Sequence, residues 1–84
     1  SRVDEVDADS LRAERAEMLY TALGELAEEF RAVIVLRELE GCDYETIGNI
    51  LQISPGTVRS RIHRGRMQLR DKLAPQLKQD PSTA

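Results

Sequence analysis

Aromatic residues and cysteine are scarce in this sequence, and long apolar runs are absent. The 84 residues include no tryptophan, one phenylalanine, two tyrosines and one cysteine. So few aromatic side chains suit a small helical bundle better than a sheet. The single cysteine, Cys42, cannot form an internal disulfide, so we expect a reducing, cytoplasmic location. Without an apolar stretch of about 18 residues or a charged-then-apolar N-terminus, neither a membrane span nor an intact secretory signal is predicted.

Patterns that support catalysis or metal binding are missing as well. The sequence has no glycine-rich phosphate loop, no serine–histidine–aspartate grouping and no spacing of metal ligands. His63 is the only histidine, and the acidic residues are scattered at helix-surface positions. We therefore expect a protein that is not an enzyme and that needs no cofactor and no metal.

Charge is distributed unevenly along the chain. The net charge is −3, but residues 1–54 hold 13 acids and 5 bases, whereas residues 55–72 hold 6 bases and 1 acid. Attraction to phosphate acts over a Debye length of about 8–10 Å, so the local balance matters more than the total. A basic segment on an acidic body therefore predicts an anionic partner for that segment.

Apolar residues recur at helical spacing, which predicts an all-α domain of four helices. We assign residues 1–9 to a flexible acidic linker remnant, residues 10–75 to the folded domain and residues 76–84 to a flexible tail. Ser10 is the expected N-cap of the first helix. The expected helices run from Ser10 to Leu26, from near Ala27 to Leu39 or Glu40, from Asp43 to near Gln52, and from Pro55 to about Leu73.

The second of these helices contains a run that is ambiguous by itself. Residues 32–36 read AVIVL, which would also fit a buried strand. Glu28 and Glu29 precede the run and favour a helix N-terminus, while Gly41 suits the residue that ends a helix. These flanking residues decide in favour of a helix.

The segment from Asp43 to Leu73 carries most of the information about function. A short helix capped by Asp43, a turn of about three residues and a longer basic helix form the layout of a helix-turn-helix. Ser54 is a suitable cap for the longer helix, and Pro55 takes its first position, where a missing N–H costs nothing. Pro75 lies just beyond the expected end of this long recognition helix.

The longer helix has two different faces. Its apolar stripe, which we expect to pack on the domain, consists of Val58, Ile62, Gly65 and Leu69. The opposite face carries small, hydrogen-bonding and basic residues, namely Gly56, Ser60, His63, Arg64 and Met67, flanked by Thr57, Arg59 and Arg61. Arginine can fork onto guanine, hydroxyls can bond a base edge or a phosphate, and glycine lets the backbone approach. The candidate DNA-binding residues are Pro55, Gly56, Thr57, Arg59, Ser60, Arg61, His63 and Arg64.

Four stretches of this sequence match a known family. They are LAEEFR at residues 26–31, VLRELEG at 35–41, YETI at 44–47 and GTVRSRIHRGR at 56–66. In these stretches the chain resembles region 4 of the extracytoplasmic-function (ECF) sigma factors of bacterial RNA polymerase, within the sigma-70 family. The resemblance covers roughly residues 11–75, and its last stretch is more specific than a generic helix-turn-helix.

The resemblance implies three partners. Residues 55–64 would read the minus-35 element of double-stranded promoter DNA from the major groove, and the domain would dock on the flap of the polymerase beta subunit. An anti-sigma factor would cover the DNA or polymerase surface, and no membrane partner is implied. By the resemblance, the best candidates for base and phosphate contacts are Thr57, Arg59, Ser60, His63 and Arg64.

Two positions depart from the family pattern. The family often has proline where Ala27 stands and alanine where Gly48 stands. On helix propensity alone, Gly48 loosens the short helix by up to about 1 kcal/mol relative to alanine. The region that melts the minus-10 element is also missing from this sequence, so we expect that these residues do not start transcription by themselves.

Two other interpretations fit parts of this sequence. The output domain of a LuxR-type response regulator shares the four-helix layout and a Gly-Thr-Val start to its recognition helix, but it resembles Thr-Val-Lys rather than Thr-Val-Arg-Ser-Arg-Ile. Alternatively, the domain acts chiefly as a protein-interaction module that an anti-sigma factor or an activator grips, which the acidic first half favours.

Overall fold

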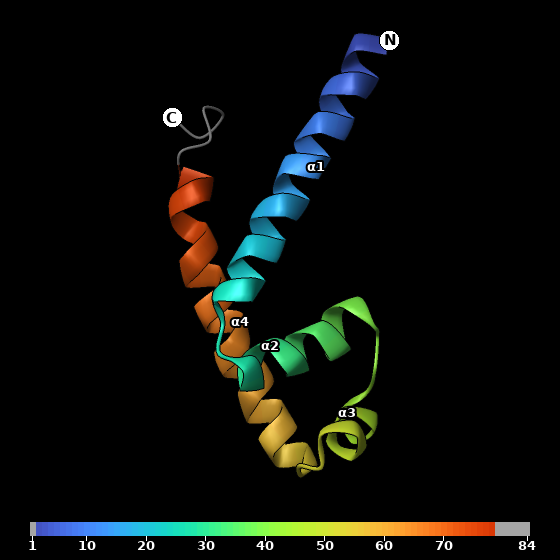
Figure 1. The fold of residues 1–84 in the computed structure, drawn as a ribbon, viewed down its shortest axis with the longest axis vertical. Coiled ribbons are helices and arrows are strands. Elements are labelled where there is room, and N and C mark those ends of the chain that lie inside the picture. Colours follow the sequence, from blue (N-terminus) through green and yellow to red (C-terminus); the bar gives the residue numbers. More distant parts are fainter. Residues whose placement is uncertain (1, 79–84) are drawn as a thin grey trace.

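Helices make up nearly all of the computed structural model, which describes the backbone of residues 2–78 and the side chains of residues 8–75. The elements, labelled in Figure 1, are α1 (Arg2–Glu25), α2 (Glu28–Ile34), η1 (Val35–Leu39), α3 (Tyr44–Leu51) and α4 (Pro55–Lys78). Because η1 is a π-helical continuation of α2, the elements form four helices. The prediction of an all-α, four-helix domain is confirmed.

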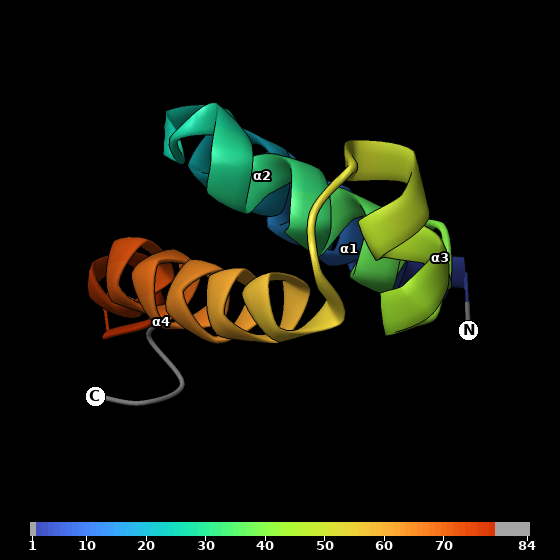
Figure 2. The same ribbon diagram turned by 90° about the horizontal axis from the view of Figure 1, so that it is seen from below.

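Helix α4 is the element on which the others pack. It contacts α1, α2 and α3. Figure 2 shows α4 along one side of the molecule and α1 with α2 along the other, with α3 at the end where α4 begins. All four helices contribute to one core, whose buried residues are Ala22, Leu23, Leu26, Val33, Ile34, Ile47, Val58 and Ile62. Burying an aliphatic side chain of this size contributes about 1.5–3 kcal/mol, so this single core holds the helices in place.

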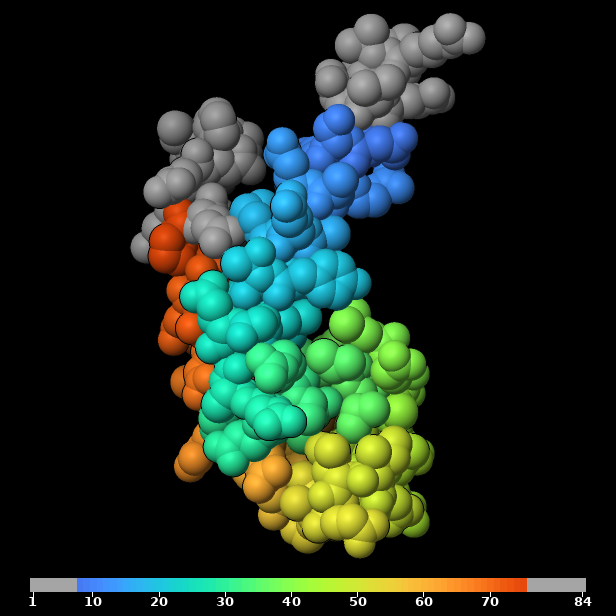
Figure 3. Space-filling model, in the orientation of Figure 1, coloured from blue at the N-terminus to red at the C-terminus, as the bar shows by residue number. Residues whose placement is uncertain are grey.

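Helix α1 is longer than the sequence pattern indicated. It begins at Arg2, so the prediction that it begins at Ser10 with that residue as N-cap was wrong. The segment ahead of Ser10 contains no glycine or proline, and its acidic residues are favourable near a helix N-terminus. Residues 8–17 are all exposed, and this part of α1 extends beyond the packed body (Figures 1 and 3). The assignment of residues 1–9 to a linker stays a prediction.

Helix α2 and η1 form one rod. The backbone N–H of Glu40 donates to Val35 O at 3.1 Å, which is the wider spacing of a π-turn. The rod ends at Gly41, whose φ of 73° lies in the left-handed region that favours glycine. Cys42 N–H then donates to Leu36 O at 3.0 Å. The prediction of a helix rather than a strand here, ended by Gly41, is confirmed.

The end of α4 differs from its prediction. The helix continues to Lys78, and Pro75 lies inside it rather than beyond its end. Proline removes one backbone donor and is tolerated here because Pro75 is exposed and only a few residues of helix follow it. The expected flexible tail falls mainly on residues 79–84, which lie outside the described residues.

Neither a membrane span nor a cluster of metal ligands is found among the described residues. None of the described helices is both long enough and apolar enough to cross a membrane. Within the same residues, no three histidine, cysteine, aspartate or glutamate side chains are grouped so that they could hold a metal ion.

Candidate nucleic-acid interface

The short helix of the predicted helix-turn-helix is capped at both ends. Asp43 precedes α3, and its Oδ1 accepts from the backbone N–H of Thr46 at 2.8 Å. Hydrogen bonds from the Thr46 backbone and side chain, with a smaller contribution from Arg37, hold the pKa of the Asp43 carboxyl below its ordinary value. At the other end Gln52 adopts a left-handed conformation, with φ 58°, and stops the helix. Both predicted ends of α3 are confirmed.

The turn after α3 folds back tightly over Gly48. Ile53 N–H donates to Gly48 O at 3.0 Å. A Cβ atom on Gly48 would lie 2.7 Å from the carbonyl oxygen of Ile53, closer than real side chains come to backbone. An alanine here would therefore have to shift the turn, a contact that the helix-propensity argument leaves out.

Helix α4 begins with the arrangement expected from the sequence. Ser54 Oγ accepts from the backbone N–H of Thr57 at 3.2 Å, and the hydroxyls of the same two residues lie 3.0 Å apart. Pro55 is the first residue of the helix. The cap satisfies one free N–H at this end and fixes the angle at which α4 leaves the turn.

The rotation of α4 about its axis is set by its buried stripe. Val58 and Ile62 are fully buried, and Gly65 lies against α2 so closely that an added Cβ would meet Ile34 Cγ1 at 2.9 Å. Leu69 packs against the same core. The predicted packing stripe is confirmed, and the opposite side of α4 consequently faces outward.

The outward face contains most of the candidate DNA-binding residues. The exposed residues are Pro55, Gly56, Arg59, Ser60, His63 and Arg64, whereas Thr57 and Arg61 are half-buried. Ser60 Oγ donates to Thr57 O at 3.2 Å, so this hydroxyl points along the helix surface and can turn toward a new partner. The fold thus brings the candidates together on the first half of α4.

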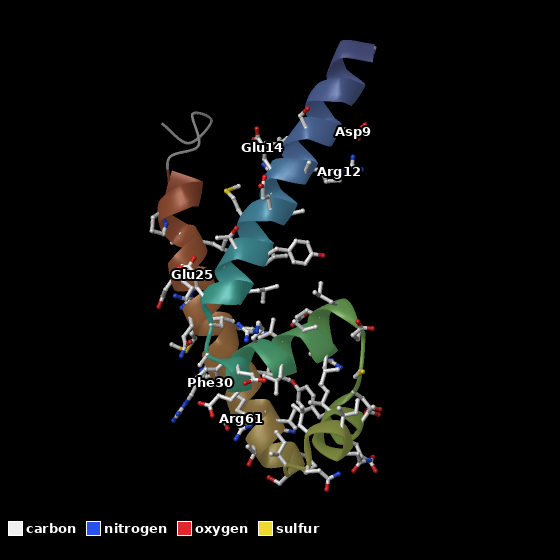
Figure 4. All side chains as sticks on the ribbon, viewed as in Figure 1. Asp9, Arg12, Glu14, Glu25, Phe30 and Arg61 are labelled. Atoms are coloured by element: carbon white, nitrogen blue, oxygen red, sulfur yellow. The ribbon has the colours of Figure 1, made fainter. Side chains whose placement is uncertain are left out.

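Arg61 lies at the margin of this face. It lines a shallow hollow together with Glu28 and Glu29 of the α2 N-terminus, and with Ala27, Ala32 and Leu51. Figure 4 labels its position on the lower part of α4. Arg61 is half-buried whereas Arg64 is exposed, so Arg61 is less available to an anion than Arg64.

Three contacts between helices were not anticipated from the sequence. The guanidinium of Arg59 lies 5.8 Å from the ring centroid of Tyr44, and that of Arg37 lies 5.1 Å from the same centroid. Arg66 Nε donates to Glu38 Oε1 at 2.9 Å, which joins α4 to η1. Helical periodicity indicates only which acids of the same helix lie near Arg66, and its partner Glu38 lies on η1. Arg66 was not among the candidate DNA-binding residues.

Comparison with known proteins assigns this helix-turn-helix to a family. The family model described as "Sigma-70, region 4" matches residues 16–69, which include the whole outward face of α4. The chain belongs to the sigma-70 region 4 family. This is a family of transcription initiation factors and not of enzymes.

Curated relatives of this region 4 domain are ECF sigma factors. It is 61% identical over 56 residues to the ECF RNA polymerase sigma factor SigE of Mycolicibacterium smegmatis, covering 67% of this chain and 22% of that protein. It is 38% identical over 73 residues to the ECF RNA polymerase sigma-E factor of Haemophilus influenzae, covering 87% of this chain and 39% of that protein. The chain therefore spans less than half of the length of these relatives.

A third relative is a sigma factor with a different name. The region 4 domain is 39% identical over 69 residues to the RNA polymerase sigma-H factor of Pseudomonas aeruginosa, covering 82% of this chain and 36% of that protein. The comparisons confirm the resemblance to ECF sigma factors and favour it over the LuxR-type interpretation.

Proposed function

We propose that this region 4 domain reads the minus-35 element of promoter DNA by placing the first half of α4 in the major groove. One observation carries the proposal. Burial of Val58, Ile62 and Gly65 fixes the rotation of α4 so that its small and basic residues form one exposed face. An α-helix with its side chains is about 10–12 Å across, which fits a major groove about 12 Å wide.

The residues of this face divide between base and phosphate contacts. Arg64 is exposed at the C-terminal end of the face and suits a forked contact to guanine O6 and N7. Ser60 and His63 can each bond a base edge or a phosphate. Gly56 and the free N–H groups at the start of α4 suit a phosphate, because the backbone can come close and the helix dipole is positive there.

We further propose that the domain docks on the beta flap of RNA polymerase, in the cytoplasm. An apolar groove between η1 and the second half of α4 supports this, since it lies away from the outward face of residues 56–64. Its lining residues are Ile34, Glu38, Arg66, Leu69, Arg70, Leu73 and Ala74. The names of the relatives identify them as RNA polymerase sigma factors, which favours polymerase as the occupant.

An anti-sigma factor is a further partner that we propose. Exposed acids on α1 and at the α2 N-terminus, among them Glu14, Glu17, Glu28 and Glu29, give the first half of the domain a negative surface. A basic or mixed-charge protein surface is complementary to it. This interaction role is compatible with DNA reading, because the acids lie outside the candidate face of α4.

Replacing two neighbouring arginines of α4 tests DNA reading. Arg64→Ala should weaken specific binding by about 1–3 kcal/mol, or about 5- to 150-fold in Kd, if the side chain forks onto a base. Arg66→Ala is the matched control, because Arg66 is on the same helix but pairs with Glu38. Fluorescence anisotropy with a labelled promoter duplex and a scrambled duplex would measure both variants.

The outcomes separate the interpretations. Loss of the promoter preference in Arg64→Ala but not in Arg66→Ala supports base reading by the first half of α4. Equal binding of the wild-type domain to promoter and scrambled duplexes at low salt contradicts sequence reading and leaves the interaction role standing.

A further inference from the structure

The ring of Tyr44 connects three elements of the domain. Tyr44 is the first residue of α3, it is half-buried, and it packs against the core. The guanidinium of Arg37 from η1 lies 5.1 Å from the ring centroid and that of Arg59 from α4 lies 5.8 Å from it. Both distances fall within the range of a cation–π interaction, about 6 Å. One ring therefore holds two cations, one of which belongs to the outward face of α4.

The backbone around Tyr44 fixes the ring in place. The Asp43 cap sets the start of α3 immediately before it. Arg37 Nη1 donates to Cys42 O at 3.0 Å, which ties η1 to the loop that leads into α3. The ring therefore has a fixed position, and it can restrain the flexible side chain of Arg59.

We propose that Tyr44 is a positioning residue for Arg59, holding its guanidinium at the α3 side of α4 ready to receive a DNA phosphate. Arg59 is exposed, and no salt bridge to it is present among the described residues. A guanidinium has five N–H donors in a fixed fork, and no carboxylate among the described residues pairs with that of Arg59, so it can make a forked bond to a phosphate. The proposal rests on the proposed DNA binding.

The chemistry of the pair favours phosphate over a base as the ligand. Arg59 flanks the face of α4 rather than lying at its centre, and Arg37 adds a second positive charge over the same ring. Arg37 also helps to lower the pKa of the Asp43 carboxyl, so its charge has a partner within the domain, whereas Arg59 has no salt bridge among the described residues. Restraining a long side chain before binding reduces the entropy lost when DNA binds.

A double-mutant cycle tests the proposal. Tyr44→Leu should weaken binding to a promoter duplex by about two- to fivefold, the equivalent of an exposed cation–π interaction. Arg59→Ala should weaken it further, and the double variant should be no weaker than Arg59→Ala alone. Tyr44→Leu combined with Arg64→Ala is the control and should be additive. Tyr44→Phe, which keeps the ring, should bind like the wild type.

Additive effects of Tyr44→Leu and Arg59→Ala would overturn the proposal, and so would equal losses in Tyr44→Phe and Tyr44→Leu. A measurement without DNA separates this result from a failure of the proposed function. In proton NMR of the free domain, the ring current of Tyr44 should shift the Arg59 Hδ resonances, and Tyr44→Leu should abolish that shift. Thermal unfolding followed by circular dichroism shows that each variant is folded. If the Arg59 resonances are unchanged in Tyr44→Leu, the positioning role is refuted whether or not the wild type binds DNA.

Discussion

Gly65 is the residue at which α4 comes closest to α2. A Cβ atom there would meet Ile34 Cγ1 at 2.9 Å and Phe30 O at 3.5 Å, and Ile34 is itself buried. The lack of a side chain at residue 65 therefore determines how near the recognition helix lies to the rest of the core. It also holds the rotation that turns Arg64 outward.

Replacing Gly65 and Gly24 by alanine should have opposite effects. Both glycines are helical, so alanine adds up to about 1 kcal/mol of helix propensity at either position, and less near a helix end such as residue 24. Gly24 has nothing within 4 Å of an added Cβ, so Gly24→Ala should raise the midpoint of thermal unfolding. Gly65→Ala should lower the midpoint, because the core must move, and the free energy of unfolding should fall by about 1–3 kcal/mol. A stabilised Gly65→Ala domain would contradict the close packing described for α2 and α4.

Part of the stability of α3 depends on a titrating group. Asp43 caps it as a carboxylate, and its lowered pKa means that the folded state favours the charged form. A carboxyl with a lowered pKa in the folded state adds stability above its unfolded pKa, which is about 4 for aspartate. That stability is lost as the pH falls through the folded pKa.

Asp43→Asn should remove this pH dependence without removing the cap. Asparagine caps helices about as well as aspartate, but it does not titrate. The difference in unfolding midpoint between wild type and Asp43→Asn should therefore be constant above about pH 5 and change toward lower pH. Urea unfolding of both proteins, repeated between pH 3 and pH 7 at steps of about one pH unit, measures this difference. Parallel pH profiles for the two proteins would show that the carboxylate form is not needed for the cap.

The elements of this domain differ in how far the sequence predicts them. The Asp43 and Ser54 caps and the left-handed Gly41 depend on residue type and immediate neighbours, so local rules predict them. The start of α1 at Arg2 and the inclusion of Pro75 in α4 do not follow from one strong local signal. Helix ends respond to small energies, and an acidic segment without breakers can continue a helix.

Contacts between different helices are the second kind of feature that the sequence does not predict. The face of residues 56–64 was predictable, because one helix and its periodicity define it. The pairing of Arg66 with Glu38 joins residues 28 positions apart, and the contact of Arg59 with Tyr44 also crosses between helices. Such contacts depend on how α3 and η1 cross α4, which no pattern along a single helix reveals.

At the scale of the whole molecule, acidic and basic residues lie in different places. The net charge is −3, yet residues 55–72 carry 6 bases and 1 acid. Glu14 lies on the extended part of α1 and Arg61 at the other end of the molecule, as the labels in Figure 4 show. With a Debye length of about 8 Å at physiological salt, Glu14 is screened from DNA bound at the first half of α4.

DNA binding by the domain should therefore depend steeply on salt in spite of its acidic total. The logarithm of the binding constant should fall with the logarithm of salt concentration, with a slope of about −0.9 for each phosphate neutralised. Arg59→Ala should make the slope shallower by about 0.9, because it removes one phosphate contact. Glu14→Gln is the control and should leave the slope unchanged. A flat salt titration of the wild type would argue against binding through phosphates.

The long α1 has a practical consequence for how this domain can be handled. Its extended part leads away from the end of the molecule where α4 begins, along the longest dimension of 48 Å. Ser10 is exposed on that part, and the helix there touches little else. A biotin or a dye attached at residue 10 would tether or report on the domain from the side opposite to DNA. The domain thus carries a built-in spacer, which would let a sensor surface present α4 to duplex DNA in a uniform orientation.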